Sequence, residues 1–406
     1  MYKEITMNKY FKIFVFVIAS LFVFNVNADE VSDLKQMMKE LQDRLDAVEK
    51  QSAETAEIAE EGGMMGWWTN TSIGGYGELH YENNGGSGTI DFHRYVLFIN
   101  HDFNDIITFN SEFELEHSIA GEGKNGEVEL EQAYLEHDWK QFGLDNTSAK
   151  YGLFLIPCGI TNEIHEPPTF YGVERNTVEK EICSNTRWEG GFQATHVIPD
   201  MDLTIIAGVH SSLTTSDGDI RGGRDKVSSA TMNKEAYSGA FRYTGVYPGL
   251  ELALSWDYEP DMNEGQSGPQ VSGKMYAVHA NYMPARGFGT RAFYGLWQLN
   301  CPAANTDTNQ CIENGRDEQW GWFAEGNYRW DVTETQSMGM FFRRQEWDDK
   351  AGTKNATTTK NNIIMNTFGV NWWLTDEAVL KADWGRKKAY GSSAVQEFNM
   401  GVGYSF

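Results

Sequence analysis

The last ten residues of the chain alternate between apolar residues and residues that are polar or glycine. One parity holds Phe398, Met400, Val402, Tyr404 and Phe406, and the other holds Glu397, Asn399, Gly401, Gly403 and Ser405. Because successive side chains of a β-strand point to opposite faces, this pattern predicts a strand with one apolar and one hydrophilic face. The hydrophilic face suits a wet interior better than a protein core. The edge strand of an ordinary soluble sheet is the alternative interpretation.

The same alternation recurs upstream, for example in residues 107–116, 250–258 and 322–330. Beyond the N-terminal segment, no stretch approaches the roughly 20 apolar residues that a membrane-spanning helix needs. The chain is 40% apolar and contains 41 glycines, which fits a transmembrane barrel because only half of each strand has to be apolar. Its 13 tryptophans and 18 tyrosines are suited to the aromatic belts at the two membrane interfaces.

Short turns and longer polar loops alternate between these strands. Short turns are expected at 104–105, 142–145, 199–200, 247–249, 284–287, 331–334 and 375–377, and longer loops at 83–89, 120–126, 157–186, 214–235, 260–273, 301–318, 348–362 and 389–395. These seven turns and eight loops make fifteen connections, hence sixteen strands within residues 64–406. The predicted fold is therefore all-β: a sixteen-stranded antiparallel transmembrane β-barrel with short turns at one end, long loops at the other and water inside.

Residues 1–28 have the features of a secretory signal peptide. Lys3, Lys9 and Lys12 precede the apolar run 13–24, and Val26-Asn27-Ala28 offers a cleavage site of small residues. A transmembrane helix is the competing interpretation, but the run falls well short of about 20 residues. Together with the barrel pattern, export predicts a place in the outer membrane of a Gram-negative bacterium.

Residues 29–63 carry a heptad pattern. Val31, Leu34, Met38, Leu41, Leu45 and Val48 recur at alternating spacings of three and four residues, with charged residues between them. The narrow apolar seam predicts a short α-helical coiled coil on the periplasmic side, which Gly62-Gly63 ends. A lone amphipathic helix on the floor of the barrel is the alternative.

Four cysteines, Cys158, Cys183, Cys301 and Cys311, are an even number in an exported chain, so disulfides are expected. Three pairings are possible. We favour Cys158 with Cys183 and Cys301 with Cys311, because each pair then closes a single predicted loop. A metal site would need further His or Cys ligands at suitable spacing, and none surround Cys301 and Cys311.

Motifs for catalysis or for cofactor binding are missing from the sequence: there is no haem-attachment sequence, no glycine-rich phosphate loop and no serine elbow. His165-Glu166-Pro167-Pro168 superficially resembles a metal-binding helix motif, but two prolines forbid a helix there. We therefore expect no enzyme activity, cofactor, metal centre or nucleic-acid partner, although a catalytic Ser/His pair assembled by folding stays an open alternative.

The third long loop, residues 157–186, combines proline, aromatic and charged residues. Such a composition favours a loop that folds into the barrel and narrows it over a mobile external tip. The residues expected at this constriction are His165, Glu166, Tyr171, Glu174 and Arg175. A cap over the mouth of the barrel, packed on neighbouring loops, is the alternative.

Three segments carry a resemblance to a known family: Glu131–Glu136, Lys150–Phe154 running into the third loop, and Phe170–Arg175 within it. Together with the heptad segment and the terminal Phe406, they make residues 29–406 resemble the phosphate-selective porin O and P family. The resemblance implies a sixteen-stranded homotrimeric porin in outer-membrane lipid. It also implies basic side chains along the lumen.

Strand parity points seven basic side chains inward: Arg94, Lys150, Arg242, Arg291, Arg329, Arg343 and Lys381. Acidic side chains share the interior, notably Glu112, Glu114 and Glu189. Of the 33 basic and 58 acidic residues of the chain, seven and twelve precede residue 64, which leaves 26 basic and 46 acidic residues and a net charge of −20 for the barrel. A field of that sign disfavours anions unless basic residues cluster at the narrowest point.

Three functions are consistent with these observations. The first is a porin for passive diffusion of small hydrophilic solutes and ions, without strong anion selectivity. The second is a substrate-specific, phosphate-type anion channel. The third is a structural barrel whose coiled coil tethers it to the cell wall, with peptidoglycan as partner.

Overall fold

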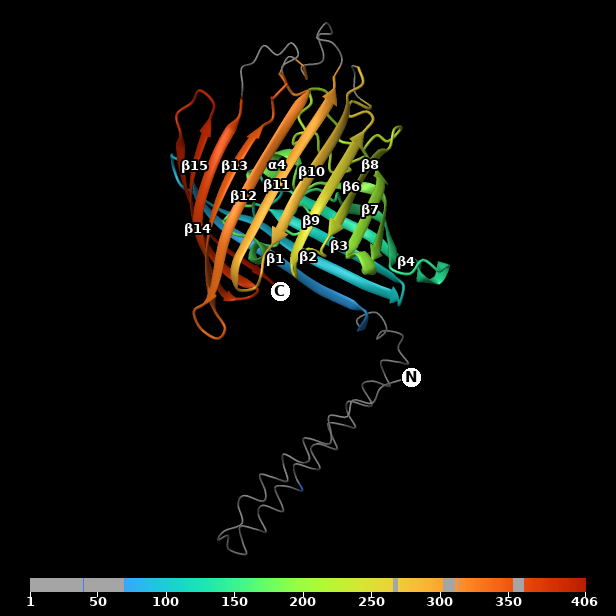
Figure 1. The fold of residues 1–406 in the computed structure, drawn as a ribbon, viewed down its shortest axis with the longest axis horizontal. Coiled ribbons are helices and arrows are strands. Elements are labelled where there is room, and N and C mark those ends of the chain that lie inside the picture. The colour runs from blue at the N-terminus through green and yellow to red at the C-terminus, as the bar shows by residue number, and fades with distance from the viewer. Residues whose placement is uncertain (1–38, 40–68, 266–268, 302–310, 313, 353–360) are drawn as a thin grey trace, which may run out of the picture. The chain divides into compact units, whose positions relative to one another are not determined.

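Sixteen antiparallel strands close into a barrel in which each strand pairs with its neighbours in sequence and β1 pairs with β16 (Figure 1). The computed structural model describes residues 39, 69–265, 269–301, 311–312, 314–352 and 361–406. The predicted sixteen-stranded antiparallel barrel is confirmed. The predicted signal peptide, 1–28, and coiled coil, 29–63, lie outside the described residues except for Lys39.

The strands are 8 to 16 residues long. They are β1 (Thr71–Asn83), β2 (Thr89–Asn104), β3 (Ile107–Glu116), β4 (Val128–Asp138), β5 (Thr147–Leu155), β6 (Trp188–Ile198), β7 (Leu203–His210), β8 (Ala236–Tyr243), β9 (Leu250–Glu259), β10 (Ser272–Tyr282), β11 (Gly287–Asn300), β12 (Glu318–Asp331), β13 (Ser337–Asp348), β14 (Ile363–Thr375), β15 (Ala378–Ala389) and β16 (Val395–Ser405). Every expected short turn and long loop coincides with a connection between two of these strands, with an overlap of at most two residues at either end. The 3₁₀ helices η1 (Trp139–Phe142) and η3 (Pro199–Met201) occupy two of the short connections.

The barrel is closed by the pairing of β1 with β16, and Phe406, which follows β16, extends this pairing by one residue. Gly75 and Phe406 exchange two backbone hydrogen bonds, each of 2.9 Å. Gly75 tolerates no side chain, because a Cβ there would lie 2.2 Å from the carbonyl oxygen of Val96 on β2. The last apolar residue of the alternating pattern thus takes part in the hydrogen bonds between the first and last strands.

The outward parity of the strands presents an apolar surface. Exposed side chains on it include Leu254, Tyr258, Phe342, Phe368, Trp384 and Met400. The opposite parity of the same strands carries buried charged residues such as Asp257, Arg343 and Asp383. This is the arrangement of a barrel that faces lipid outside and encloses polar groups inside. Among the described residues, no helix is both long enough and apolar enough to cross a bilayer.

The connection between β5 and β6, residues 156–187 (hereafter loop 3), lies against the inner face of the barrel. Its helix α4 (Thr177–Ile182) contacts β11, β12 and β13, and its 3₁₀ helix η2 (Pro167–Thr169) contacts β16, β1 and β15. Figure 1 shows α4 in green within the outline of the strands. Loop 3 therefore touches widely separated parts of the wall.

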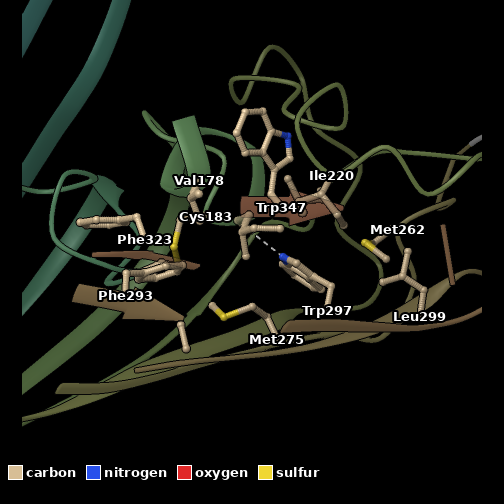
Figure 2. Packing of buried hydrophobic residues seen from close by; sticks show 14 of the residues in the cluster. Val178, Cys183, Ile220, Met262, Met275, Phe293, Trp297, Leu299, Phe323 and Trp347 are labelled. Atoms are coloured by element: carbon tan, nitrogen blue, oxygen red, sulfur yellow. Dashed lines mark hydrogen bonds between the residues drawn. A yellow bond between two sulfur atoms is a disulfide. The ribbon is translucent and has the colours of Figure 1, made fainter. Parts of the chain in front are cut away.

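One side of the interior is apolar, where the sequence pattern suggested a wet lining all round. On β10 to β13 the inward side chains Met275, Phe293, Trp297, Phe323 and Trp347 are buried, and they pack with residues of α4 and of the neighbouring loops (Figure 2). Gly295 and Gly321 make room for the helix: a Cβ on either would come within 2.7 or 2.8 Å of side chains of α4. The physical reason for the difference is that parity predicts an inward direction but cannot tell whether water or protein fills the space.

Candidate functional site

Loop 3 is ordered by its own residues. A disulfide between Cys158 and Cys183, with their Cα atoms 5.6 Å apart, joins its two ends. Asn176 caps α4, since its side chain accepts a hydrogen bond from the backbone N–H of Glu179 over 2.8 Å. The buried Glu179 carboxylate in turn accepts from the backbone N–H groups of Ile160 and Thr161, at 2.6 and 3.0 Å. The loop is thus a compact unit and not a loose strap.

The second disulfide joins Cys301 and Cys311, whose Cα atoms are 6.1 Å apart, in the connection between β11 and β12. Both expected pairs are confirmed. Only the Cys158–Cys183 pair lies in loop 3, and it belongs to the apolar cluster beneath α4.

Three arginines from the barrel wall hold the backbone of loop 3. Arg94 donates from Nη2 to the carbonyl oxygen of His165 (3.1 Å), Arg291 to that of Thr169 (3.0 Å), and Arg343 to that of Tyr171 (2.6 Å). Each of the three arginines is at most 5% exposed. Hydrogen bonds from a charged donor to a buried carbonyl are among the stronger ones in proteins. These predicted lumen charges therefore serve as anchors of the loop.

The same arginines are also paired with groups on the wall. Arg94 Nε donates to Glu78 over 2.6 Å, and Arg343 Nε donates to Glu325 over 2.8 Å. Arg291 Nε donates to the side-chain oxygen of Asn281 over 3.0 Å. Two of the three cations are thus compensated at short range, and they contribute little net field to an ion that passes through the lumen.

The remaining predicted basic residues occupy varied settings. Lys381 Nζ lies 3.5 Å from the ring centroid of Phe170, Arg329 stacks on Trp373 at 4.0 Å and bonds Asp376 at 2.9 Å, Arg242 pairs with Glu163, and Lys150 lies 4.7 Å above Tyr134. Within the described residues, the buried Nζ of Lys381 has no hydrogen-bond partner. It packs against the face of the Phe170 ring instead.

The predicted acidic residues of the interior are buried as well. Glu112 accepts hydrogen bonds from Tyr76 (3.1 Å) and Gln132 (2.7 Å), and Glu114 is 2% exposed. Glu189 accepts from Arg187 at 3.0 Å. Arg187 escaped the sequence analysis because it lies at the boundary of loop 3 and not on a strand. It also bonds Asp257 and Glu259, each at 2.5 Å.

The residues expected at the constriction divide into two groups. Tyr171 is buried between Phe341 and Trp373, with ring centroids 5.6 and 5.2 Å away, so it packs against the wall. Glu166, Glu174 and Arg175 are partly exposed.

His165 is 3% exposed, and its Nε2 lies 3.3 Å from Glu112 and 3.6 Å from Glu131. Burial alone would lower the pKa of His165, but the hydrogen bonds and charges of these two carboxylates outweigh burial and raise it to about 9. The side chain therefore carries a positive charge at neutral pH and joins loop 3 to β3 and β4.

A cluster of three arginines was not predicted. Arg175 of loop 3 lies near Arg221 and Arg224 of the connection between β7 and β8, and burial together with the charges of Arg224 and Arg175 lowers the pKa of Arg221 to about 9. In the part of the chain that the structure describes, Nη1 of Arg175 and Nη1 of Arg221 have no hydrogen-bond partner. The Arg-Gly-Gly-Arg sequence at 221–224 was the available signal.

No protein-family model matches the chain. An uncharacterized protein of Aquifex aeolicus is 37% identical over 180 residues, which are 43% of this chain and 39% of that relative. The match thus spans about two fifths of the relative's length.

Solved structures similar to this chain include outer-membrane channels and other outer-membrane proteins. The channel DcaP of Acinetobacter baumannii and the anion-selective porin of Comamonas acidovorans each superpose with a TM-score of 0.53 at 10% identity, over 83% of this chain and 97% and 99% of theirs. The fold is that of an outer-membrane porin. The trimer form of OmpT, an outer membrane protein of Vibrio cholerae, shares the porin fold with a TM-score of 0.52 at 10% identity, over 83% and 99% of the two chains. At these identities the likeness is one of fold.

Proposed function

We propose that this protein is an outer-membrane porin through which small hydrophilic solutes and ions diffuse passively, without strong anion selectivity. The observation that carries the proposal is the cavity beside loop 3. Its volume is about 210 Å³, and its lining includes Glu112, Gln132, Glu163 and Glu166. A polar cavity between an inward loop and the wall is suited to a diffusion channel that selects small solutes by size. A channel, and not an enzyme, is the function proposed.

The charge of this opening favours cations over anions. Three of its lining residues are glutamates. Glu112 faces His165 and Glu163 pairs with Arg242, which leaves the partly exposed Glu166 as the lining glutamate without a salt bridge among the described residues. Rings of carboxylates favour cations in pores. The net charge of −20 for residues 64–406 acts in the same direction.

Reversal potentials of single channels in a salt gradient test this proposal. The wild-type protein is expected to conduct with a neutral to cation-preferring reversal potential. Glu166→Gln should shift it towards anions, because Glu166 lines the cavity and is partly exposed. Glu122→Gln, in an exposed loop, is the matched control and should change nothing. Strong anion selectivity of the wild type would refute the proposal.

The second candidate is a phosphate-type anion channel, as in the phosphate-selective porin O and P family. The cluster of Arg175, Arg221 and Arg224 favours it, because Nη1 of Arg175 and Nη1 of Arg221 have no hydrogen-bond partner among the described residues, and guanidinium groups can bind a phosphate by two parallel hydrogen bonds. Block of the chloride current by micromolar phosphate, lost in Arg221→Gln/Arg224→Gln, would support it. A chloride current indifferent to millimolar phosphate would refute it.

We further propose that the porin is a homotrimer in outer-membrane lipid, as the trimer form of OmpT is. The predicted coiled coil at 29–63 would then lie in the periplasm, where it could reach peptidoglycan. Light scattering of the detergent-solubilised protein, with and without residues 29–63, tests the trimer. Co-sedimentation with cell walls, lost on deletion of that segment, tests the tether, and negligible conductance would favour a purely structural barrel.

A further inference from the structure

A β-bulge in β2 turns an additional side chain towards the interior. Glu78 of β1 pairs with Arg94, but the next residue, Leu79, pairs with Phe92, so His93 is an extra residue in β2. Without the bulge, His93 would follow the parity opposite to Arg94 and face outward. Instead its ring stacks on that of the buried His80, with centroids 4.7 Å apart. Bulges commonly re-aim a side chain next to a functional site.

Glu174 of loop 3 completes a triangle with these two imidazoles. Its Oε1 lies 3.5 Å from His80 Nδ1 and 3.2 Å from His93 Nε2. All three atoms lie within 4.8 Å of one another. In a tetrahedral site, ligand atoms about 2.0–2.1 Å from Zn²⁺ are roughly 3.3 Å from one another. The distances from Glu174 Oε1 to His80 Nδ1 and to His93 Nε2 are close to this value.

His80 supplies an independent observation that points to a ligand. Its side chain is 2% exposed, yet Nδ1 makes no hydrogen bond to any described residue. A buried polar nitrogen without a partner is costly and rare. Beyond Glu174, the facing oxygen of Glu82 is 3.8 Å from the same nitrogen and offers a further ligand.

The outer nitrogens of both histidines face carboxylates. His80 Nε2 lies 3.1 Å from Glu78, which Arg94 fixes in place at 2.6 Å. His93 Nδ1 lies 3.4 Å from Asp91. A carboxylate behind each histidine is the arrangement that orients imidazole ligands in metal sites, because it fixes which nitrogen carries the proton.

The position of Glu174 is set by its neighbours in loop 3. The backbone N–H of Val173 donates to Asp383 over 2.7 Å, and that of Gly172 donates to Asn371 over 3.3 Å. Gly172 has φ of +87°, a conformation that favours glycine. The carboxylate is therefore presented to the histidines by a segment that is itself bonded to β14 and β15.

We propose that His80, His93 and Glu174 bind a divalent first-row transition-metal ion, with Zn²⁺ as the reference ion. Two imidazoles and a carboxylate form a ligand set that Zn²⁺ uses in proteins, with water or Glu82 in the fourth position. The ion would join β1 and β2 of the barrel wall to loop 3, and so fix the loop to strands other than those that α4 contacts. The site does not depend on what the barrel conducts.

Isothermal titration of the metal-free, untagged full chain with Zn²⁺ tests the proposal. One Zn²⁺ per chain is expected, with binding weakened at least tenfold in His80→Gln, His93→Gln and Glu174→Gln. His137→Gln is the matched control, because His137 is a partly exposed histidine at the far end of β4, and it should bind as the wild type does. Zn²⁺ should also raise the Tm of the wild type and not that of the three variants.

If Glu174 only forms ion pairs with His80 and His93 and no metal binds, the expected results differ. In that case the three substitutions would lower the Tm of the metal-free protein while Zn²⁺ would leave the wild type unchanged, and this result would overturn the proposal. Equal Zn²⁺ binding by the wild type and all three variants would overturn it too. Should one variant fail to fold, the absorption spectrum of Co²⁺ bound to the wild type still tests the proposal. A spectrum typical of octahedral coordination by oxygen atoms alone would overturn it, because it would exclude the two histidines as ligands.

Discussion

Arg343 donates from Nη2 to the backbone carbonyl of Tyr171 over 2.6 Å and from Nε to the carboxylate of Glu325 over 2.8 Å. One side chain of β13 thus links the wall of the barrel to the loop inside it. The guanidinium geometry is essential, because its separate N–H groups reach two acceptors at once. The charge of Arg343 is thereby committed to structure, which bears on both the stability of the loop and the selectivity of the pore.

Arg343→Met should release loop 3 from this part of the wall. We expect a loss of about 3–5 kcal/mol in stability, since removing one partner of a buried ion pair leaves Glu325 uncompensated, together with a larger and noisier single-channel current. The double variant Arg343→Met/Glu325→Gln should recover most of the stability but keep the noisy current. Arg344→Gln, whose side chain is exposed on the same strand, is the control. A quiet, unchanged current in Arg343→Met would contradict the anchoring role.

Gly321→Val should displace α4. A Cβ at this position would already lie 2.8 Å from Val178 and 3.0 Å from Trp347, so a branched side chain cannot fit beneath the helix. Overpacking of this kind costs about 1–3 kcal/mol. Gly326→Val is matched on β12, where the atom nearest to a Cβ is 3.8 Å away, and it should be tolerated. Thermal unfolding of the two variants in detergent compares them, and equal Tm values would argue against close packing of α4.

The strands were predictable because their signals are local. Each follows from a period of two, and each turn from a short polar or glycine- and proline-containing segment. Parity also gave the inward direction of Arg94 and Arg343. It did not give their acceptors, which are carbonyl oxygens of loop 3 at residues 165 and 171. Contacts between residues so distant in sequence leave no local pattern.

The alternation of side chains along the strands could not predict two other features. Arg291 and Phe293 share one face of β11, but the first bonds loop 3 and the second packs beside α4. Only the path of the loop decides which of them meets protein. His93 was missed for a different reason: the bulge shifts its direction by one residue, and the alternation rule assumes unbroken pairing.

The Cys158–Cys183 disulfide should contribute more than the other. It closes a segment with a sequence separation of 25, against 10 for Cys301–Cys311. Loop-closure entropy predicts about 3.5 and about 2.7 kcal/mol for these lengths. Cys158→Ser/Cys183→Ser should therefore lower the Tm further than Cys301→Ser/Cys311→Ser, and it alone should increase the open-channel noise. If both pairs of substitutions leave the current equally quiet, the disulfide has no part in restraining loop 3.

The ion pair of His165 should make the attachment of loop 3 sensitive to alkaline pH. Glu112 of β3 and Glu131 of β4 face its Nε2, Arg94 of β2 bonds its carbonyl, and the ring of Tyr76 on β1 lies 5.9 Å away. The carboxylates raise the pKa of His165 from 6.5 to about 9 despite burial. A group whose pKa is raised on folding stabilises fully below its unfolded value, and this contribution disappears as the pH rises through the folded value.

Stability measured by thermal unfolding should therefore be level below pH 6.5 and fall between pH 6.5 and about 9, as protons leave His165. His165→Gln should be less stable at pH 6 and lose the slope in this window. His196→Gln is the control, because His196 bonds Thr147 on β5 and does not touch loop 3. Open-channel noise should rise over the same pH range in the wild type, since an uncharged His165 holds the loop less tightly to Glu112 and Glu131. A slope that persists in His165→Gln would assign the titration to another group.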